Sequence, residues 1–285
     1  NHVCSLKSNN NVECWGDNDY GQSEDYTEED VAQVSAGWDH TCVLKYNGNV
    51  YCKGHNNHGQ SYNYTEEDVV QVSAGGYHTC ILKSEGNVDC NGWNYYGQAE
   101  DYYGRDVVQV SAGFTHTCIL KSEGNVECWG SNQQGESDNY TGGNAVQVSL
   151  GLQLTCILKS NGNVDCRGNN YYGQAEDYNG NDAIKVFNGW YHTCVLKSDG
   201  NVECWGNNQY GESEDYNEGD AVQISVGRGY NCALTEDKPD KVVINECSFC
   251  SPNWALNDTW SECSITDNQY TNYYDINNCE EDVIK

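Results

Sequence analysis

Apolar and polar residues alternate along short segments of this chain, and the same segments return every 38 residues. In the sixth copy, Cys194, Leu196 and Cys204 fall on one face of two strands, because strand side chains alternate between faces. Between the strands, Ser198-Asp199-Gly200 is typical of a hairpin loop whose third residue takes a left-handed backbone. Residues that tolerate this conformation hold the third position in the first six copies: Asn10, Gly48, Gly86, Gly124, Gly162 and Gly200. The pattern therefore predicts one β-hairpin per copy.

A third apolar segment precedes the hairpins of the later copies, at 31–34, 69–72, 107–110, 145–148, 183–186 and 221–224. Three clear strands and a short fourth, in a unit repeated about seven times, predict the blades of an all-β propeller. Each such unit must stack on its neighbours to bury its apolar face. No segment has helical periodicity. The first copy lacks the leading strand and the last copy has it, so we expect strands from both chain ends to close the ring.

Each of the first six copies also carries two cysteines ten positions apart. In the predicted hairpin register the two lie directly opposite each other, at a separation that a disulfide can span. Buried free thiols are the alternative, and a zinc site has less support because no second cysteine pair completes it. We predict the disulfides Cys4–Cys14, Cys42–Cys52, Cys80–Cys90, Cys118–Cys128, Cys156–Cys166 and Cys194–Cys204. Such pairs indicate an oxidising compartment.

The seventh copy begins at Cys232 and has no cysteine ten positions later. The chain has 17 cysteines, an odd number, so at least one is free, joined to another chain or paired with sequence not printed. We predict a Cys232–Cys247 disulfide that ties the ring shut. The remaining tail cysteines could form an intermolecular disulfide. Alternatively, all four tail cysteines could bind a zinc ion: Cys247, Cys250, Cys263 and Cys279.

Several short elements recur in fixed order in the copies: A-G-x-x-H, G-x-V, W-G and G-Q. This order resembles the regulator of chromosome condensation (RCC1) repeat, from residue 1 to about residue 245. The resemblance implies a seven-bladed β-propeller over 1–245 and a binding role, because protein-interaction platforms dominate that family. In the tail, Trp260-Ser261-Glu262-Cys263 after Trp254 resembles a thrombospondin type 1 module of the kind on archaeal surface proteins. That likeness implies a small disulfide-rich module over 246–285.

The net charge of −29, with only 14 Lys and Arg residues, excludes partners that need cationic surfaces. DNA, RNA and anionic lipid surfaces are therefore not expected partners. No apolar run approaches the 18 residues of a membrane span. The chain contains no Met, and Asn1 falls inside a repeat, so we expect a processed chain that is secreted or held at the cell surface.

Three recurring residue types are candidate sites. The histidines could form a metal ring, but one per blade suits a structural role with bonds to backbone: His2, His40, His78, His116 and His192. Tyrosines at one fixed position suit packing between blades: Tyr26, Tyr64, Tyr102, Tyr140, Tyr178 and Tyr216. More variable tyrosines are candidates for ligand binding, because they offer a flat apolar ring with a polar tip: Tyr20, Tyr96, Tyr172 and Tyr210.

The sequence also contains candidate sites for glycosylation and for calcium binding. Asn63, Asn139 and Asn257 begin Asn-x-Thr triplets, which are acceptors for N-glycosylation in a secreted protein. Acidic loops such as 24–30 and 212–220 could supply oxygen ligands for calcium, although none has the spacing of a twelve-residue calcium loop. We therefore expect no cofactor, with calcium as the alternative.

No catalytic triad, paired carboxylates or phosphate-binding loop stands out, so we predict a protein without enzymatic activity. The preferred function is an extracellular propeller platform for adhesion or assembly, as a filament or coat subunit, with a protein or glycan partner. Homo-oligomers or disulfide-linked filaments are expected forms. The alternatives are a carbohydrate-binding propeller lectin and an enzyme inhibitor; an enzyme or inhibitor would need non-repeated polar residues clustered at one mouth of the propeller.

Overall fold

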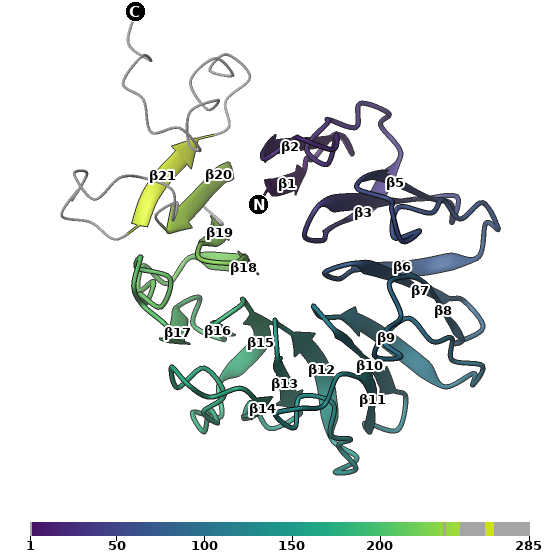
Figure 1. Cartoon of the computed structure of the whole chain (residues 1–285). Helices are drawn as coiled ribbons and strands as arrows, with labels where there is room; N and C mark the ends of the chain where they lie inside the picture. The colour runs from purple at the N-terminus through teal and green to yellow at the C-terminus, as the bar shows by residue number, and fades with distance from the viewer. Residues whose placement is uncertain (1, 236–237, 246–259, 265–285) are drawn as a thin grey trace, which may run out of the picture.

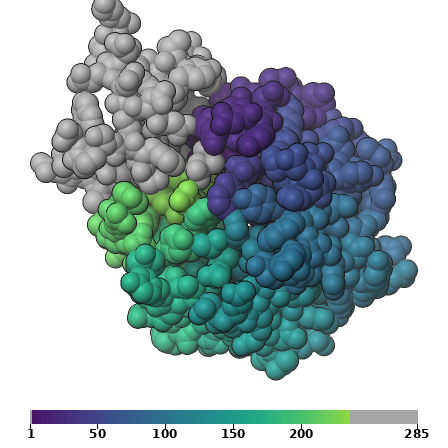
Figure 2. All heavy atoms as spheres, in the orientation of Figure 1, coloured from purple at the N-terminus to yellow at the C-terminus, as the bar shows by residue number. Residues whose placement is uncertain are grey.

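The computed structural model describes residues 2–235, 238–245 and 260–264, the last two ranges by their strands alone. Every element in this part of the chain is a β-strand, as predicted, and the strands form seven sheets that follow one another around an axis (Figure 1). Figure 2 shows the repeats in chain order around the ring. The strands are β1 (His2–Leu6), β2 (Val12–Gly16), β3 (Val31–Ala36), β4 (His40–Lys45), β5 (Val50–Gly54), β6 (Val69–Ala74), β7 (His78–Lys83), β8 (Val88–Gly92), β9 (Val107–Ala112), β10 (His116–Lys121), β11 (Val126–Gly130), β12 (Ala145–Leu150), β13 (Leu154–Lys159), β14 (Val164–Gly168), β15 (Ala183–Asn188), β16 (His192–Lys197), β17 (Val202–Gly206), β18 (Ala221–Val226), β19 (Asn231–Thr235), β20 (Lys238–Asn245) and β21 (Trp260–Ser264).

Five of the sheets repeat one antiparallel order, for example β3-β4-β5. The last sheet has the order β18-β19-β20-β21, and the first contains β1 and β2. We call β3, β6, β9, β12, β15 and β18 the inner strands. The predicted short fourth strand is a single bridge in each of six blades: Val12–Tyr26, Val50–Tyr64, Val88–Tyr102, Val126–Tyr140, Val164–Tyr178 and Val202–Tyr216.

The hairpin register agrees with the prediction. Cys194 pairs with Cys204 and Leu196 with Val202, which sets the third loop residue in the left-handed region. The φ of Gly200 is 79° and that of Asn10 is 63°. At Gly200 a Cβ atom would also lie 2.4 Å from the carbonyl oxygen of Gly219, so both the backbone angle and the space require glycine.

The core lies between successive blades. Leu196 and Val202 of one blade pack with Ile224 and Ala233 of the next, all of them buried. The six predicted cysteine pairs are joined as disulfides, each with its Cα atoms 4.1 Å apart. Each disulfide therefore fixes two strands of one blade, while the apolar side chains stack the blades.

The end of the propeller departs from the repeat. In the ladder between β19 and β20, Cys232 lies opposite Ile244, where the earlier blades place a second cysteine. The predicted partner Cys247, the triplet at Asn257 and most of the proposed 246–285 module lie outside the described residues. No described helix is long and apolar enough to cross a membrane.

Candidate functional site

The recurring histidines are buried, and each reaches a side chain of the next blade. We call these contacts the inter-blade clips. Their Nε2 distances are 2.5 Å for His2–Thr41, 2.7 Å for His40–Thr79, 2.7 Å for His78–Thr117, 2.8 Å for His116–Thr155 and 2.7 Å for His192–Asn231. Blade stacking places a threonine or asparagine side chain beside the Nε2 atom of each ring, so the partner of Nε2 is not the expected backbone group. Backbone hydrogen bonds, of Trp38 and Leu154, also act on His2 and His116.

The hydrogen bonds show which ring nitrogen of these histidines carries a proton. The Thr79 hydroxyl donates to the carbonyl of Gln60 at 2.8 Å, so it accepts from the Nε2–H of His40. The hydrogen bonds thus place a proton on Nε2. Burial lowers the pKa of His40 and of His78 to about 3. Burial likewise lowers the pKa of His116 to about 4, so these rings act as structural donors between blades rather than as a metal ring.

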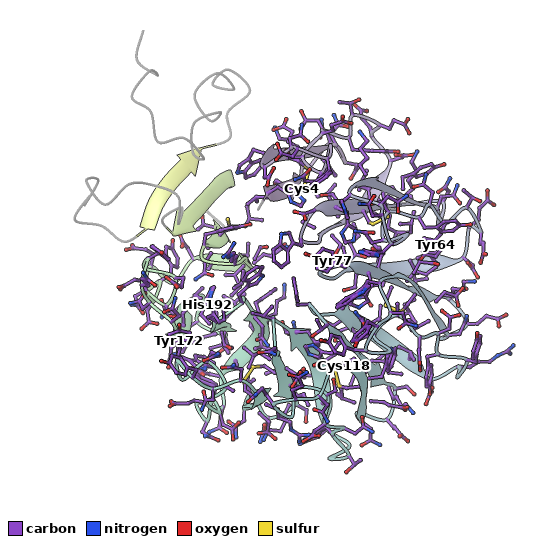
Figure 3. All side chains as sticks on the ribbon, viewed as in Figure 1. Cys4, Tyr64, Tyr77, Cys118, Tyr172 and His192 are labelled. Atoms are coloured by element: carbon purple, nitrogen blue, oxygen red, sulfur yellow. A yellow bond between two sulfur atoms is a disulfide. The ribbon has the colours of Figure 1, made fainter. Side chains whose placement is uncertain are left out.

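The regular tyrosines pack between blades, as predicted. The Tyr64 hydroxyl accepts from Asn91 Nδ2 of the next blade at 2.8 Å. Tyr178 stacks on Trp205 of the next blade, with ring centroids 6.0 Å apart. In Figure 3, Tyr64 lies near the outer edge of the ring, whereas Tyr77 lies near the axis.

Three aromatic side chains that do not repeat converge on the axis. They follow the inner strands β3, β9 and β15, at the first variable position of A-G-x-x-H or its equivalent. Trp38 lies 4.6 Å from both Phe114 and Trp190, and Phe114 lies 5.8 Å from Trp190, between ring centroids. These three residues, here called the axial aromatic cluster, line a cavity of about 350 Å³ between the inner strands. The Arg228 guanidinium lies 4.3 Å from the Trp190 ring, in a cation–π contact.

Further aromatic rings contact the axial aromatic cluster on two sides. Tyr77 stacks on Trp38 at 5.6 Å and contacts Trp93 at 6.0 Å. On the other side, Trp190 contacts Tyr191 at 6.2 Å, and Tyr191 contacts Tyr172 at 5.6 Å. With the neighbours of Trp93 and Tyr172 these rings form one connected set, here called the aromatic track: Tyr95, Tyr96, Trp93, Tyr77, Trp38, Trp190, Tyr191, Tyr172 and Tyr171.

The track lies at one end of the blades. The Trp93 N–H donates to the Tyr77 carbonyl at 2.8 Å, so the loop after each outer strand lies beside the turn after an inner strand. At the two ends of the track, Tyr95 is 77 % exposed and Tyr171 is 83 % exposed. The track therefore combines a half-buried centre with open aromatic ends.

The predicted ligand-binding tyrosines are exposed, and the track includes two of them. Tyr96 and Tyr172 belong to it directly. Tyr20 reaches it through His55 and His58, with Tyr20 and His55 centroids 4.8 Å apart. No described ring contact joins Tyr210 to the track.

Acidic side chains lie near Trp38 at this end of the molecule. Burial raises the pKa of Asp39, which follows Trp38, and the charges of Asp17 and Asp19 act in the same direction. Burial and the charge of Asp39 also raise the pKa of Tyr77. At the opposite end of the strands, lysines of the hairpins are paired with carboxylates, as in the pairs Lys83–Asp89 and Lys121–Glu127, both at 2.7 Å. Across the described residues, no group of three or more His, Cys, Asp and Glu side chains is arranged to hold a metal ion.

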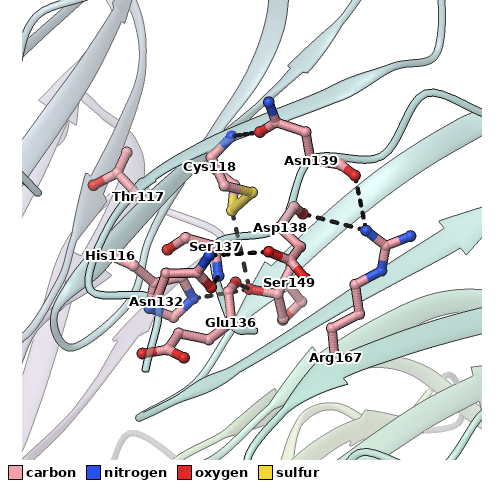
Figure 4. The surroundings of a disulfide bond; sticks show 12 residues. His116, Thr117, Cys118, Asn132, Glu136, Ser137, Asp138, Asn139, Ser149 and Arg167 are labelled. Carbon is pink, nitrogen blue, oxygen red and sulfur yellow. Dashed lines mark hydrogen bonds between the residues drawn. A yellow bond between two sulfur atoms is a disulfide. The ribbon is translucent and has the colours of Figure 1, made fainter. Parts of the chain in front are cut away.

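Two predicted glycosylation sites occupy one structural position. The Oδ1 atoms of Asn63 and Asn139 accept from the N–H groups of Cys52 and Cys128, each at 2.8 Å. Both asparagines are exposed. Figure 4 shows Asn139 beside Arg167, which donates to its carbonyl at 2.8 Å. Other blades fill this position with aspartates that accept the same bond: Asp25, Asp101, Asp177 and Asp215.

Comparison with known proteins gives a family and a fold. The family described as Regulator of chromosome condensation (RCC1) repeat matches residues 1–22, 31–60, 69–98, 107–136, 145–174 and 183–212. A search of curated proteins found no match.

Solved structures of similar shape share about a fifth of their residues with this chain. Prp20p of Saccharomyces cerevisiae, in a study of its binding to Gsp1p and histones, has a TM-score of 0.69 and 18 % identity, covering 81 % of this chain and 80 % of its own. The CRINKLY WD40 ectodomain of the Arabidopsis thaliana receptor kinase ACR4 has a TM-score of 0.68 and 21 % identity, covering 85 % and 90 %. The ectodomain of the Physcomitrella patens receptor kinase CR4 has a TM-score of 0.70 and 20 % identity, covering 84 % and 68 %.

Proposed function

Because the chain belongs to the regulator of chromosome condensation (RCC1) repeat family, we propose that it is a binding protein without enzymatic activity. Its binding surface is the aromatic track. The main observation behind this proposal is the contact between Trp38 and Trp190. Their rings come from blades far apart in the chain, and the ring centroids lie 4.6 Å apart. Structural repetition alone does not require rings at these positions, since Gly76 and Leu152 occupy the same place in other copies.

The preferred partner is a protein. Binding hot spots are enriched in Trp, Tyr and Arg, they lie near the centre of an interface, and a rim of other residues excludes water around them. Trp38, Trp190 and Arg228 have this composition and central position, with Tyr95 and Tyr171 toward the rim. The net charge of −29 favours a partner with a basic rim. The Saccharomyces cerevisiae neighbour Prp20p was studied for its binding to Gsp1p and histones, which supports a protein as the class of ligand here.

The proposed location is extracellular or at the cell surface, with a role in adhesion or assembly. Six disulfides within one ring are expected in an oxidising compartment, and two of the similar structures are receptor ectodomains. We count the ring as a seven-bladed propeller in which β1 and β2 form an incomplete blade. Thiol alkylation before lysis of the source cells tests the location: the twelve hairpin cysteines should stay unlabelled until reduction. Labelling without reductant would contradict it.

Surface variants test the binding role. Fluorescent protein is incubated with a cell-surface fraction of the source organism, and bound protein is titrated. Tyr95→Ser combined with Tyr171→Ser should weaken binding about tenfold, because both open ends of the track are lost. Tyr103→Ser is the matched control, since Tyr103 is 80 % exposed and lies outside the track. Equal binding by all three proteins would reject the track as the binding surface.

A glycan ligand is the second candidate, because Tyr95 and Tyr171 present open rings on which the apolar face of a sugar can stack. Treating the surface fraction with protease or with periodate separates the two classes. Loss of binding after protease alone supports a protein partner, and loss after periodate alone supports a glycan.

Assembly through tail cysteines is part of the proposal and has its own test. Electrophoresis of the native protein with and without reductant should give a covalent oligomer only in the non-reduced sample. Monomer in both samples would reject disulfide-linked assembly.

A further inference from the structure

The inner strands carry exposed aliphatic side chains near their starts. The five inner strands from β6 to β18 each have a β-bulge at this point, and the residue that the bulge adds is aliphatic. The exposed fraction is 52–54 % for four of these side chains and 39 % for the fifth. They form a set that we call the aliphatic arc: Val70, Val108, Val146, Ile184 and Val222.

The bulge explains why these side chains stay in solvent. In β6, Val69 and Val72 pack against the preceding blade. Gln71 Nε2 instead donates to the Val110 carbonyl of the next blade at 3.0 Å. Val70 is the extra residue of the bulge and has no ladder partner on β7, so it takes part in neither contact.

The fold does not require an aliphatic residue at the bulge. Ala32 occupies the same position of β3. Threonine would also suit a strand, because it has the branched shape of valine together with a polar hydroxyl. An exposed aliphatic side chain in five successive blades therefore indicates a use other than strand formation.

The members of the arc are brought together around the axis. The inner strands are the strands nearest to the axis (Figure 1). One glutamine side chain is long enough to bridge two neighbouring inner strands, as Gln109 does when it donates to the Val148 carbonyl at 2.9 Å. The arc therefore follows five neighbouring strands as one surface.

This surface is separate from the aromatic track. Val108 and Phe114 are six positions apart along β9 and the turn after it, which corresponds to about 20 Å of extended chain. The arc thus lies at the other end of the inner strands from the axial aromatic cluster. None of its five members lines the axial cavity.

Acidic residues surround the arc. The hairpin loops and the loops before the inner strands meet at this end, where the Ser84 N–H donates to the Asp68 carbonyl at 2.9 Å. The hairpin lysines are paired with carboxylates, and the one charged residue on the described inner strands is Lys185. In the described part of the chain no basic side chain pairs with three exposed glutamates of these loops: Glu67, Glu123 and Glu218.

We propose that the aliphatic arc is a second docking surface, for a protein segment that has an aliphatic tip between Lys or Arg side chains. Packing of the tip on the arc removes apolar surface of both partners from water. The basic flanks pair with the surrounding glutamates, such as Glu67 and Glu123. A second copy of this chain fits less well, because it brings the same glutamates against one another.

A peptide of this chemistry tests the surface. The probe is a synthetic peptide with two central leucines between two Lys-Arg pairs, titrated into the full 285-residue protein with labelled Val and Ile methyl groups. We expect saturable binding that shifts the methyl signals of Val70, Val108 and Val146, and that weakens when salt rises from about 50 mM to about 500 mM. Two control peptides, one with Ser for Leu and one with Glu for Lys and Arg, should not bind. Equal binding by either control overturns the proposal, as does no binding by the probe.

Protein variants then locate the peptide. Val70→Thr, Val108→Thr and Val146→Thr combined keep the branched shape and should weaken the peptide about tenfold, because apolar contact is lost. Tyr95→Ser with Tyr171→Ser is the control at the other end of the strands and should leave peptide affinity unchanged. Equal affinity of the threonine variant and the wild type would reject the arc. Sedimentation without peptide tests the other occupant: a dimer that disappears in the threonine variant would make the arc a contact between copies and overturn the proposed partner.

Discussion

His40 and Thr79 belong to successive blades, and the histidine Nε2 lies 2.7 Å from the threonine hydroxyl. The Thr79 hydroxyl in turn donates a hydrogen bond to the Gln60 carbonyl at 2.8 Å. All three residues are buried, so no water replaces these bonds. A histidine that recurs in five of the copies thus joins its blade to the next.

Thr79→Val should lower the free energy of unfolding by about 1–3 kcal/mol, because the methyl group leaves the His40 donor and the Gln60 acceptor buried and unpaired. Urea titration at pH 7 measures the change. Thr27→Val is the control, since Thr27 is exposed and outside the clips. Equal stability of Thr79→Val and the wild type would mean that the clip contributes nothing net.

Stability should fall as pH is lowered below about 6.5. The pKa values of His78 and His192 are lowered by burial to about 3 and about 4, below the ordinary value near 6.5. Between these values the unfolded chain binds more protons than the folded one, so stability is full above pH 6.5 and is lost on acidification. Each such histidine should lower the free energy of unfolding by about 1.4 kcal/mol for each pH unit of acidification in this range. Urea titrations from pH 7 to pH 5 measure it.

The matched variant for this pH effect is His116→Leu, because the chain itself places the buried Leu154 at the equivalent position. The variant should have a smaller pH slope, by one histidine's contribution, over the same range. An unchanged slope would assign the acid sensitivity to other groups.

The hairpins could be predicted from the sequence because their geometry is local. The separation of ten positions from Cys194 to Cys204, with a left-handed glycine between them, determines the register that the structure has. The blade-packing role of Tyr178 was likewise predictable from its regular recurrence, and its ring stacks on Trp205. A residue that recurs in every copy indicates a contact that every blade makes.

Contacts between blades could not be predicted in the same way. The partner of His40 lies 39 residues away, and the stacking of blades decides whether backbone or Thr79 faces the ring. The axial aromatic cluster was missed because Trp38, Phe114 and Trp190 vary within the repeat, and only ring closure brings them together. Bulky aromatic residues at a variable turn position next to an invariant glycine were the available signal.

The hairpin disulfides should stabilise the ring one blade at a time. Replacing Cys118 and Cys128 together by alanine should lower the free energy of unfolding by about 2–3 kcal/mol, the value for a short closed loop. The strands should keep their pairing, because Leu120 and Val126 remain buried in the same register. Denaturant titration gives the energy, and unchanged far-ultraviolet circular dichroism checks the fold. A loss of circular dichroism would show that the disulfide is needed to form the blade.

Asn63 makes a structural hydrogen bond and also begins a predicted glycosylation triplet, and two substitutions separate the two roles. Asn63→Asp keeps the acceptor for the Cys52 N–H, as Asp25 and Asp101 do in other blades, so stability should be unchanged while any glycan at this site is lost. Asn63→Ala removes the acceptor as well and should cost about 1 kcal/mol. Intact mass of the protein secreted from a eukaryotic host measures the glycan, and urea titration measures stability. Equal stability of the two variants would show that the bond is not needed, and an unshifted mass for Asn63→Asp beyond the substitution itself would show that the site carries no glycan.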